Sequence, residues 1–279
     1  MNDFEILIKY LDLCIKDTQN NAFVIGKTFL GQNIYAFHKG PINGKQMLIS
    51  GGIHAREYIS CLVVLKLLED YDLPYGCYFV PTINLDGICL SICGLDFVKD
   101  NDIKYLLYRL NNNSTDFKLW KANVRGVDLN TNFNAGFGES EFAKPLPCSS
   151  GFAGEYVNSE PETSALVNFV NTIKIDYSVA FHSKGKVVYY GFEGLDKNVL
   201  KKENKMASFF AKNLGYKKIR SIGSTGGLGD YLGLKHNVPS VTIELGDDKL
   251  KHPINLQYFD IIYKSQYKTL KKFMEKNFD

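Results

Sequence analysis

Apolar residues recur at helical spacing near the start of the chain, at Phe4, Leu7, Ile8, Leu11 and Ile15. Residues three and four positions apart lie on one face of a helix, so this pattern predicts a first amphipathic helix. Similar patterns predict four more helices, at residues 58–70, 159–173, 199–214 and 258–278. The helix that starts at residue 159 opens with Ser-Glu-Pro-Glu, which matches the capping box of a helix N-terminus.

Six short apolar runs have the character of β-strands. They lie at Asn33–Phe37, Gln46–Ser50, Cys77–Ile83, Tyr177–Phe181, Lys186–Tyr190 and Ser240–Glu244. Strands and helices alternate along the chain, and this order is typical of an α/β fold in which helices cover both faces of a central sheet.

The stretch from Asp86 to Asn158 differs from the rest of the chain. It is rich in glycine, asparagine and serine and carries only scattered apolar residues. A connection of this length is unusual in a compact domain, so we expect it to shape a binding surface. No low-complexity linker or internal repeat interrupts the sequence, and 279 residues suit one large domain. We therefore expect residues 1–279 to form a single domain.

Charge and cysteine content narrow the classes of function. The net charge is only +3 and no run of five or six like charges occurs, which argues against a nucleic acid or another polyanion as partner. Charged residues interrupt every apolar run near the N-terminus, so we expect neither a signal peptide nor a membrane span. Without an export signal, the six cysteines are expected to be reduced thiols, several of them buried. A cytoplasmic protein without a membrane partner is the resulting prediction.

Isolated polar residues stand where the predicted strands end. They are His54 and Glu57, Asn84 and Asp86, His182 and Ser183, and Glu244. In open α/β sheets, ligands bind at the carboxyl ends of the strands. One crevice is therefore expected to receive all of these groups.

This set of side chains suits zinc chemistry. A zinc ion that activates water is often held by two histidines and a glutamate. His54 and Glu57 are three residues apart, so both can reach one ion from a single helical turn. The spacing alone is weak evidence, because an isolated histidine after a strand is more often structural than a ligand. Glu244 stands in an apolar strand, where an unpaired carboxylate is costly to bury, but a structural salt bridge would explain it equally well.

Taken together, these segments resemble the metallocarboxypeptidases, zinc peptidases with the carboxypeptidase A-like fold. Five blocks occur in the family's order: Gly51-Gly52-Ile53-His54-Ala55-Arg56-Glu57-Tyr58, Asn84-Leu85-Asp86-Gly87, Gly126-Val127-Asp128-Leu129-Asn130, His182-Ser183 and Thr242-Ile243-Glu244. The resemblance runs from about residue 26 to the C-terminus and so covers most of the chain. It implies a mixed central sheet with helices on both faces and one zinc ion per chain.

The resemblance also implies roles for single residues. His54, Glu57 and His182 would bind the zinc ion, which lowers the pKa of its water. Glu244 would accept the proton of the attacking water. Arg125 would polarise the scissile carbonyl, although it lies one position away from the strictest alignment.

Substrate contacts follow from the same blocks, with two departures from the family pattern. Asn130 and Arg56 would contact the substrate, and Asp128 would orient a zinc-binding histidine. Where the carboxypeptidases carry an arginine that grips the terminal carboxylate, this chain has Thr131. A tyrosine expected in a mobile loop is also missing, and Ile222 is the candidate occupant of its place. Without the arginine, bidentate capture of a C-terminal carboxylate is lost there, so ordinary C-terminal trimming is not expected.

The variant blocks are most similar to a bacterial subgroup, the γ-D-glutamyl-meso-diaminopimelate peptidases that cut peptidoglycan stem peptides. The similar segments are residues 120–130, 182–185, 226–231, 244–248 and 252–253. This similarity implies hydrolysis of the γ-D-Glu–diaminopimelate bond in a small murein peptide. The extra carboxylates of such a substrate make Ser183 and Lys184 candidate contacts, although Lys184 could equally be a solvated surface lysine.

Two alternatives stay open at the level of sequence. The chain could be a metallocarboxypeptidase that trims ordinary peptides with a carboxylate clamp built from other residues. It could also be a non-catalytic ligand-binding module that keeps the fold, although the three ligands and Glu244 are all retained. The sequence gives no indication of the oligomeric state.

Overall fold

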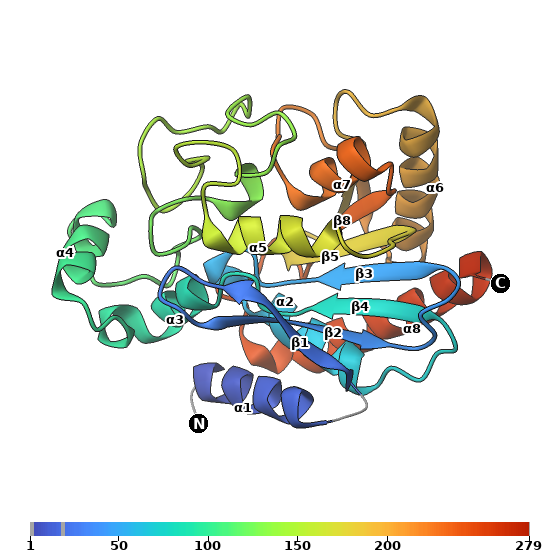
Figure 1. Ribbon diagram of the computed structural model, residues 1–279, viewed down its shortest axis with the longest axis horizontal. Coiled ribbons are helices and arrows are strands. Elements are labelled where there is room, and N and C mark those ends of the chain that lie inside the picture. The colour runs from blue at the N-terminus through green and yellow to red at the C-terminus, as the bar shows by residue number, and fades with distance from the viewer. Residues whose placement is uncertain (1–2, 18–19, 279) are drawn as a thin grey trace.

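The computed structural model describes residues 3–17 and 20–278, and its named strands form one mixed sheet (Figure 1). The order across the sheet is β1-β2-β4-β3-β5-β8-β6-β7. The strands are β1 (Ala22–Lys27), β2 (Asn33–Lys39), β3 (Gln46–Ser50), β4 (Gly76–Val80), β5 (Tyr177–Ser183), β6 (Val187–Tyr190), β7 (Lys217–Arg220) and β8 (Ser240–Leu245). The four central strands run parallel, whereas β2 and β6 pair antiparallel with them. The mixed sheet that the resemblance implied is therefore confirmed.

Helices cover both faces of this sheet, as predicted. They are α1 (Asp3–Lys16), α2 (Ile59–Glu69), α3 (Leu85–Cys93), α4 (Asn101–Leu110), α5 (Pro161–Val170), α6 (Lys197–Leu214), α7 (Leu228–His236) and α8 (Phe259–Phe278). Apolar residues of α1, α2, α6 and α8 pack on one face in a single core cluster. A second cluster lies on the other face beneath α5 and α7 (Figure 1). None of the described helices combines the length and the apolar character needed to cross a lipid bilayer.

Burial explains which strands the sequence pattern revealed. All five residues of β3 and of β4 are buried, and strands covered on both faces read as continuous apolar runs. The edge strand β7 is exposed throughout and carries three cations in four residues, so it gave no apolar signal. The other edge strand, β1, is interrupted by a bulge between Val24 and Gly26 and was not predicted either.

The expectation of a long irregular stretch from Asp86 to Asn158 was wrong in its first third. The structure has two helices there, α3 and α4, joined through the 3-10 turn Gly94–Phe97. A third apolar cluster centred on the fully buried Trp120 packs beneath them. Helix α4 was not predicted from the hydrophobic pattern because most of its residues are polar and only Leu107 is buried. Residues 111–158 do run without a long helix or strand.

The helix predicted to start with a capping box begins differently. Its N-cap is Glu160, whose side chain makes no capping hydrogen bond, and Pro161 occupies the first turn. Proline is favoured there because its fixed φ suits the helix and its missing N–H is not needed. The Ser159 hydroxyl donates instead to Glu160 Oε1, at 2.8 Å. The helix ends at Val170, three residues earlier than predicted.

Candidate metal centre and active-site cleft

Two glycines bring the first pair of functional side chains to the end of β3. Gly51 and Gly52 follow this strand, and His54 and Glu57 come next, the latter within the 3-10 turn Ala55–Glu57. Gly52 has a φ of +65°, and a Cβ atom there would lie 2.4 Å from the sulfur of Cys61. Only glycine fits both conditions, so the sharp turn that carries His54 into the site depends on it.

The other two residues come from neighbouring strands. His182 lies near the end of β5 and Glu244 near the end of β8, and the two are direct partners in the parallel ladder. Because parallel strands end at one edge of the sheet, these side chains meet His54 and Glu57 at that edge. The crevice predicted from the strand ends is therefore present for these four residues.

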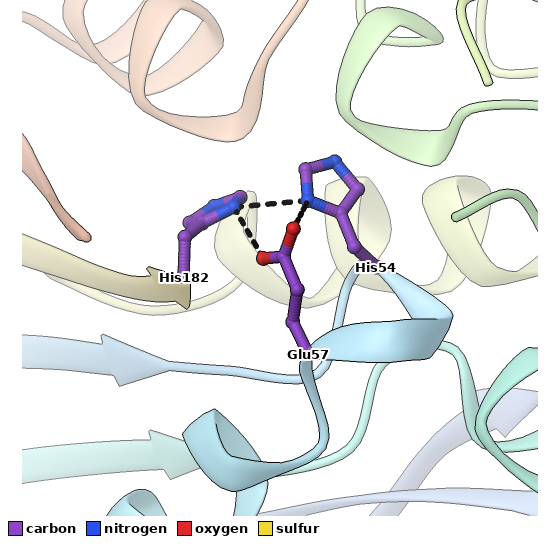
Figure 2. A group of neighbouring side chains, drawn as sticks. All are labelled: His54, Glu57 and His182. Atoms are coloured by element: carbon purple, nitrogen blue, oxygen red, sulfur yellow. Dashed lines mark hydrogen bonds and ion pairs between the residues drawn. The ribbon is translucent and has the colours of Figure 1, made fainter. Parts of the chain in front are cut away.

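His54, Glu57 and His182 converge on one point (Figure 2). The Nδ1 atoms of the two histidines are 3.1 Å apart. The carboxylate oxygens of Glu57 lie 3.0 Å from Nδ1 of His54 and 3.3 Å from Nδ1 of His182. Ligand atoms about 2.0–2.1 Å from one tetrahedral zinc ion are separated by about 3.3 Å. The spacing and the two-nitrogen, one-carboxylate set both fit a single zinc ion, and all three side chains are buried.

A buried carboxylate supports this set from behind. Asp128 Oδ1 lies 3.3 Å from Nε2 of His54, the ring nitrogen that faces away from the other ligands. Its second oxygen accepts hydrogen bonds from the Lys121 ammonium at 2.8 Å and from the Gly151 N–H at 3.1 Å. Burial alone would raise the pKa of Asp128, but Lys121 and His54 hold this pKa far below its ordinary value. Such a carboxylate fixes the orientation of a metal-binding histidine.

Glu57 and Glu244 are two carboxyl groups with opposite electrostatic environments. Burial acts to raise the pKa of Glu57, but the adjacent His54 and His182 hold it well below its ordinary value. For Glu244, burial and the negative charge of Glu57 raise the pKa to about 7. Its Oε2 atom is buried and has no hydrogen-bond partner among the described residues. A carboxyl group with these properties beside a metal centre suits proton transfer near neutral pH.

A cleft of about 460 Å³ opens over these residues. On the sheet face it is lined by Ala180 and His182 of β5 and by Thr242 and Glu244 of β8. Side chains two positions apart in a strand point to the same face, so each functional residue has a small neighbour beside it. The cleft therefore extends from the metal centre along the sheet, where small side chains leave room for a substrate.

Two of the predicted substrate-binding residues line this cleft. Asn130 lies in its wall, and its Oδ1 accepts the N–H of Leu228 at 3.2 Å. Ile222 also lines the cleft and is 61% exposed. Thr131 lies next to Asn130, but its hydroxyl donates to the backbone oxygen of Asp128 at 2.8 Å. The Thr131 hydroxyl is therefore used in a hydrogen bond within the turn at residues 128–131.

Three other predicted contacts lie outside the residues that line the cleft in the described part of the chain. Arg56 donates to the backbone oxygen of Leu119 at 3.2 Å. The backbone N–H of Ser183 donates to Glu57 Oε2 at 3.0 Å, so Ser183 positions a metal ligand. Lys184 donates to the backbone oxygen of Asp248 at 2.6 Å, a contact that engages its ammonium group away from the metal centre.

The structure brings Lys121, and not Arg125, into the cleft. The ammonium group of Lys121 is held by Asp128 beside the metal centre, and Lys121 lines the cavity. Arg125 lies 3.5 Å from the carboxylate of Glu160 and stacks over the ring of Phe29. Sequence reasoning missed Lys121 because nothing in its spacing marks it. Only the turn that brings it to Asp128 reveals its place.

Comparison with known proteins places the chain among zinc peptidases. A family model described as zinc carboxypeptidase matches residues 9–277. The chain is 30% identical over 259 residues to the γ-D-glutamyl-L-diamino acid endopeptidase 1 of Lysinibacillus sphaericus. That match covers 86% of this chain and 63% of the relative, so the chain spans less than two thirds of the relative's length.

Solved structures share the fold at lower identity. The bovine thrombin-activatable fibrinolysis inhibitor superposes with a TM-score of 0.77 at 20% identity, covering 98% of this chain and 96% of that one. The murein-tripeptide amidase MpaA of Escherichia coli O157 superposes with a TM-score of 0.58 at 17% identity, covering 91% of each chain. At these identities the likeness establishes the fold alone.

Proposed function

This chain belongs to the zinc carboxypeptidase family, and we propose that it hydrolyses the γ-D-Glu–diaminopimelate bond of peptidoglycan stem peptides. The match to a γ-D-glutamyl-L-diamino acid endopeptidase supports this substrate class. His54, Glu57 and His182 would hold the zinc ion, which in such sites polarises a carbonyl and lowers the pKa of a bound water.

Three side chains of the cleft would take part in the reaction, in proton transfer, in charge stabilisation and in substrate contact. Glu244, whose buried Oε2 has no hydrogen-bond partner among the described residues, would accept a proton and return it to the leaving amine. Lys121 would place its positive charge beside the carbonyl oxygen on which negative charge develops. We assign this role to Lys121 in preference to Arg125, because the guanidinium of Arg125 is engaged with Glu160. Asn130 would contact the substrate from the cleft wall.

The observation that carries the substrate assignment is Thr131. Its hydroxyl donates a hydrogen bond to a backbone oxygen. A threonine also lacks the guanidinium group with which an arginine binds a terminal carboxylate through two hydrogen bonds. A site without that clamp does not favour ordinary α-linked C-terminal residues. A γ-linked substrate brings further carboxylates of its own, which other cations of the cleft can bind.

The test is a side-by-side assay of the zinc-loaded protein with three substrates. They are L-Ala-γ-D-Glu-meso-diaminopimelate, its all-L α-linked analogue and a blocked dipeptide with a C-terminal aromatic residue. We expect kcat/KM to be about 10⁴-fold higher for the γ-linked tripeptide, because the α-linked peptides leave polar groups of the site unpaired. Equal or faster cleavage of the dipeptide would reject this function.

That last outcome would favour the second candidate, a carboxypeptidase acting on ordinary peptides, which the family description supports. In that case a cation elsewhere in the cleft would replace the missing arginine. Thr131→Arg separates the two candidates further. If the murein function holds, this change should raise the weak dipeptide activity and impair cleavage of the γ-linked tripeptide.

We also propose a cytoplasmic location and a single catalytic domain. All six cysteines are free thiols, and four of them are buried, which is the ordinary state of cysteine in a reducing compartment. The single sheet, whose strands span residues 22–245, supports one domain.

A further inference from the structure

The floor of the active-site cleft continues beyond β5 and β8 onto β6. Tyr189 of β6 pairs directly with Thr242 of β8, and residues that face each other across an antiparallel ladder point to the same side of the sheet. Both residues line the cleft. Ile219 of β7, which pairs with Tyr189, lines it as well. The register and the lining residues therefore agree that Tyr189 stands on the cleft side of the sheet.

The adjacent residue, Tyr190, faces the other way, because successive residues of a strand alternate between the two faces. Tyr190 packs against the core cluster formed by α1, α2, α6 and α8. The ammonium of Lys218 lies 5.3 Å from the centre of its ring. Tyr190 also lines a separate groove beside α6, together with Lys197 and Leu200. These two tyrosines thus have the same strand in common but lie on opposite faces of the sheet.

Tyr189 and the candidate catalytic carboxylate Glu244 are close neighbours on the cleft floor. Tyr189 pairs with Thr242, two residues before Glu244, so Tyr189 and Glu244 are diagonal neighbours on one face. Such neighbours are about 7–8 Å apart, a span that an aromatic side chain can bridge. Burial raises the pKa of Tyr189, and the negative charges of Glu244 and Asp248 raise it further. Glu244 lies near the end of β8 and Asp248 just beyond it, so the phenol lies toward the end of the sheet that carries the metal centre.

The hydroxyl of Tyr189 carries its proton at neutral pH. Its pKa is raised above the ordinary value of 10.0, so the phenol is a neutral donor throughout the range in which the enzyme would work. No hydrogen bond joins this hydroxyl to any of the described residues. Strand β6 is paired on both sides, by β8 and by β7, so the backbone that carries the donor is already fixed. A fixed donor without a partner in a cleft can bind a ligand at little ordering cost.

The substrate brings a hydrogen-bond acceptor to this place. Glu244 would return a proton to the leaving amine, so the residue that carries this amine lies beside Glu244, over the small side chains of Ala180 and Thr242. In the γ-D-Glu–diaminopimelate substrate, a free carboxylate is bonded to the carbon next to the leaving nitrogen, only about 2.5 Å from that nitrogen. This carboxylate comes close to the carboxylate of Glu244, and two negative charges at short range repel each other. A donor diagonally across from Glu244 offsets that repulsion.

We propose that Tyr189 is a substrate-binding residue whose hydroxyl donates a hydrogen bond to the carboxylate on the carbon next to the leaving nitrogen. A phenol provides one neutral donor, whereas an arginine provides two charged ones, so this contact is weaker than the clamp that is missing at Thr131. The assignment rests on the proposed function, because it concerns the leaving residue of the γ-linked substrate.

The experiment compares L-Ala-γ-D-Glu-meso-diaminopimelate with an analogue in which that one carboxylate is a carboxamide. The values of kcat and KM are measured for the wild-type holoenzyme and for Tyr189→Phe, which removes the hydroxyl and keeps the ring. A hydrogen bond to a charged group is worth roughly 10- to 100-fold, so kcat/KM for the acid should fall by about that factor. The neutral amide should lose only about 2- to 10-fold, so the acid-to-amide ratio should fall about tenfold. The contact is present in the bound substrate as well as in the transition state, so the loss should appear mainly in KM.

Tyr190→Phe is the matched control. It makes the same change one residue away on the same strand, on the face directed toward α6. Both peptides should keep their wild-type kcat/KM values in this variant. An equal fall in the two variants would show that the packing of β6, and not the Tyr189 hydroxyl, causes the loss, and would overturn the proposal. A fall in Tyr189→Phe that is the same for acid and amide would overturn it too.

Calorimetry separates this inference from the proposed function. The acid and the amide are titrated into zinc-loaded Glu244→Gln protein, with and without Tyr189→Phe. If the wild-type protein cleaves neither γ-linked peptide, the proposed function fails, whereas a binding preference for the acid that is lost in Tyr189→Phe still supports the role of Tyr189. The absence of such a preference would refute that role. If the wild-type protein cleaves the γ-linked acid but Tyr189→Phe leaves the acid-to-amide ratio unchanged, the inference about Tyr189 is wrong and the proposed function stands.

Discussion

Replacing Asp128 tests how the buried carboxylate supports the metal centre. This side chain is 1% exposed and holds two partners at once, Nε2 of His54 at 3.3 Å and the Lys121 ammonium at 2.8 Å. Asp128→Asn keeps the shape but removes the negative charge. We expect zinc affinity to fall by about 10- to 100-fold, because the orienting contact to His54 is weakened.

The same change should also destabilise the metal-free protein. Breaking a fully buried ion pair costs about 3–5 kcal/mol, whereas an exposed pair is worth about 1 kcal/mol or less. The side chain of Lys121 is 22% exposed, so the expected loss lies between these limits, at about 2–3 kcal/mol. Urea unfolding in the presence of a chelator measures this loss without the contribution of bound zinc.

A second substitution separates the two effects. In Asp128→Asn/Lys121→Met, no ammonium group is left without a partner, so most of the unfolding free energy should return while zinc affinity stays low. Asp12→Asn on the exposed face of α1 is the control and should change stability by no more than about 0.5 kcal/mol. If Asp128→Asn binds zinc as tightly as the wild-type protein, the supporting role of Asp128 is refuted. If the double variant is no more stable than the single one, the ion-pair argument is refuted.

Three further outcomes are expected. Glu244→Gln should retain the fold and zinc but lose about 10²–10⁴-fold in kcat, since the amide cannot accept a proton; near-native turnover would remove Glu244 from the mechanism. Lys121→Met should lower kcat by about 10²–10³-fold, whereas Arg125→Ala should leave kcat nearly unchanged; steady-state kinetics that give the reverse order would restore the sequence-based assignment. Burial raises the pKa of Glu203 from 4.5 to about 7, so the stability that its protonated form provides is complete below about pH 4.5 and is lost as the pH rises through 7. Relative to the wild-type protein, Glu203→Gln should therefore gain up to about 3 kcal/mol in unfolding free energy between pH 4.5 and pH 8, and urea titrations that show a constant difference would contradict this shift.

The helices and strands that the sequence revealed share one property. Strands β3, β4, β5 and β8 are buried, and α1, α2, α6 and α8 present apolar stripes to the sheet, so their patterns followed from burial alone. Helix α3 was missed although seven of its nine residues are buried, whereas two other missed elements bury little. Thus β7 is exposed throughout, and α4 buries only Leu107.

The metal site could be predicted from the sequence because its residues stand in blocks that resemble those of the zinc carboxypeptidases, and local geometry is consistent with that resemblance. His54 and Glu57 share one turn, and His182 and Glu244 stand at strand ends whose common edge follows from parallel pairing. The substrate residues could not be assigned in this way. Lys184 and Arg125 have the right charge, yet their partners Asp248 and Glu160 are remote in sequence and hold them outside the cleft.

The sequence by itself predicted the fold class through buried periodicity, and through its resemblance to the zinc carboxypeptidases it predicted the three candidate zinc ligands and the candidate catalytic carboxylate Glu244. Only the tertiary structure decided which of the candidate cations lines the cleft. Lys121 enters the cleft through its contact with Asp128, whereas Arg125 is held outside it by Glu160. A lysine or arginine side chain is long and keeps its charge in water, so it can occupy many different surface positions. Its role is set by the partners that the fold brings near it, and spacing along the chain does not record those partners.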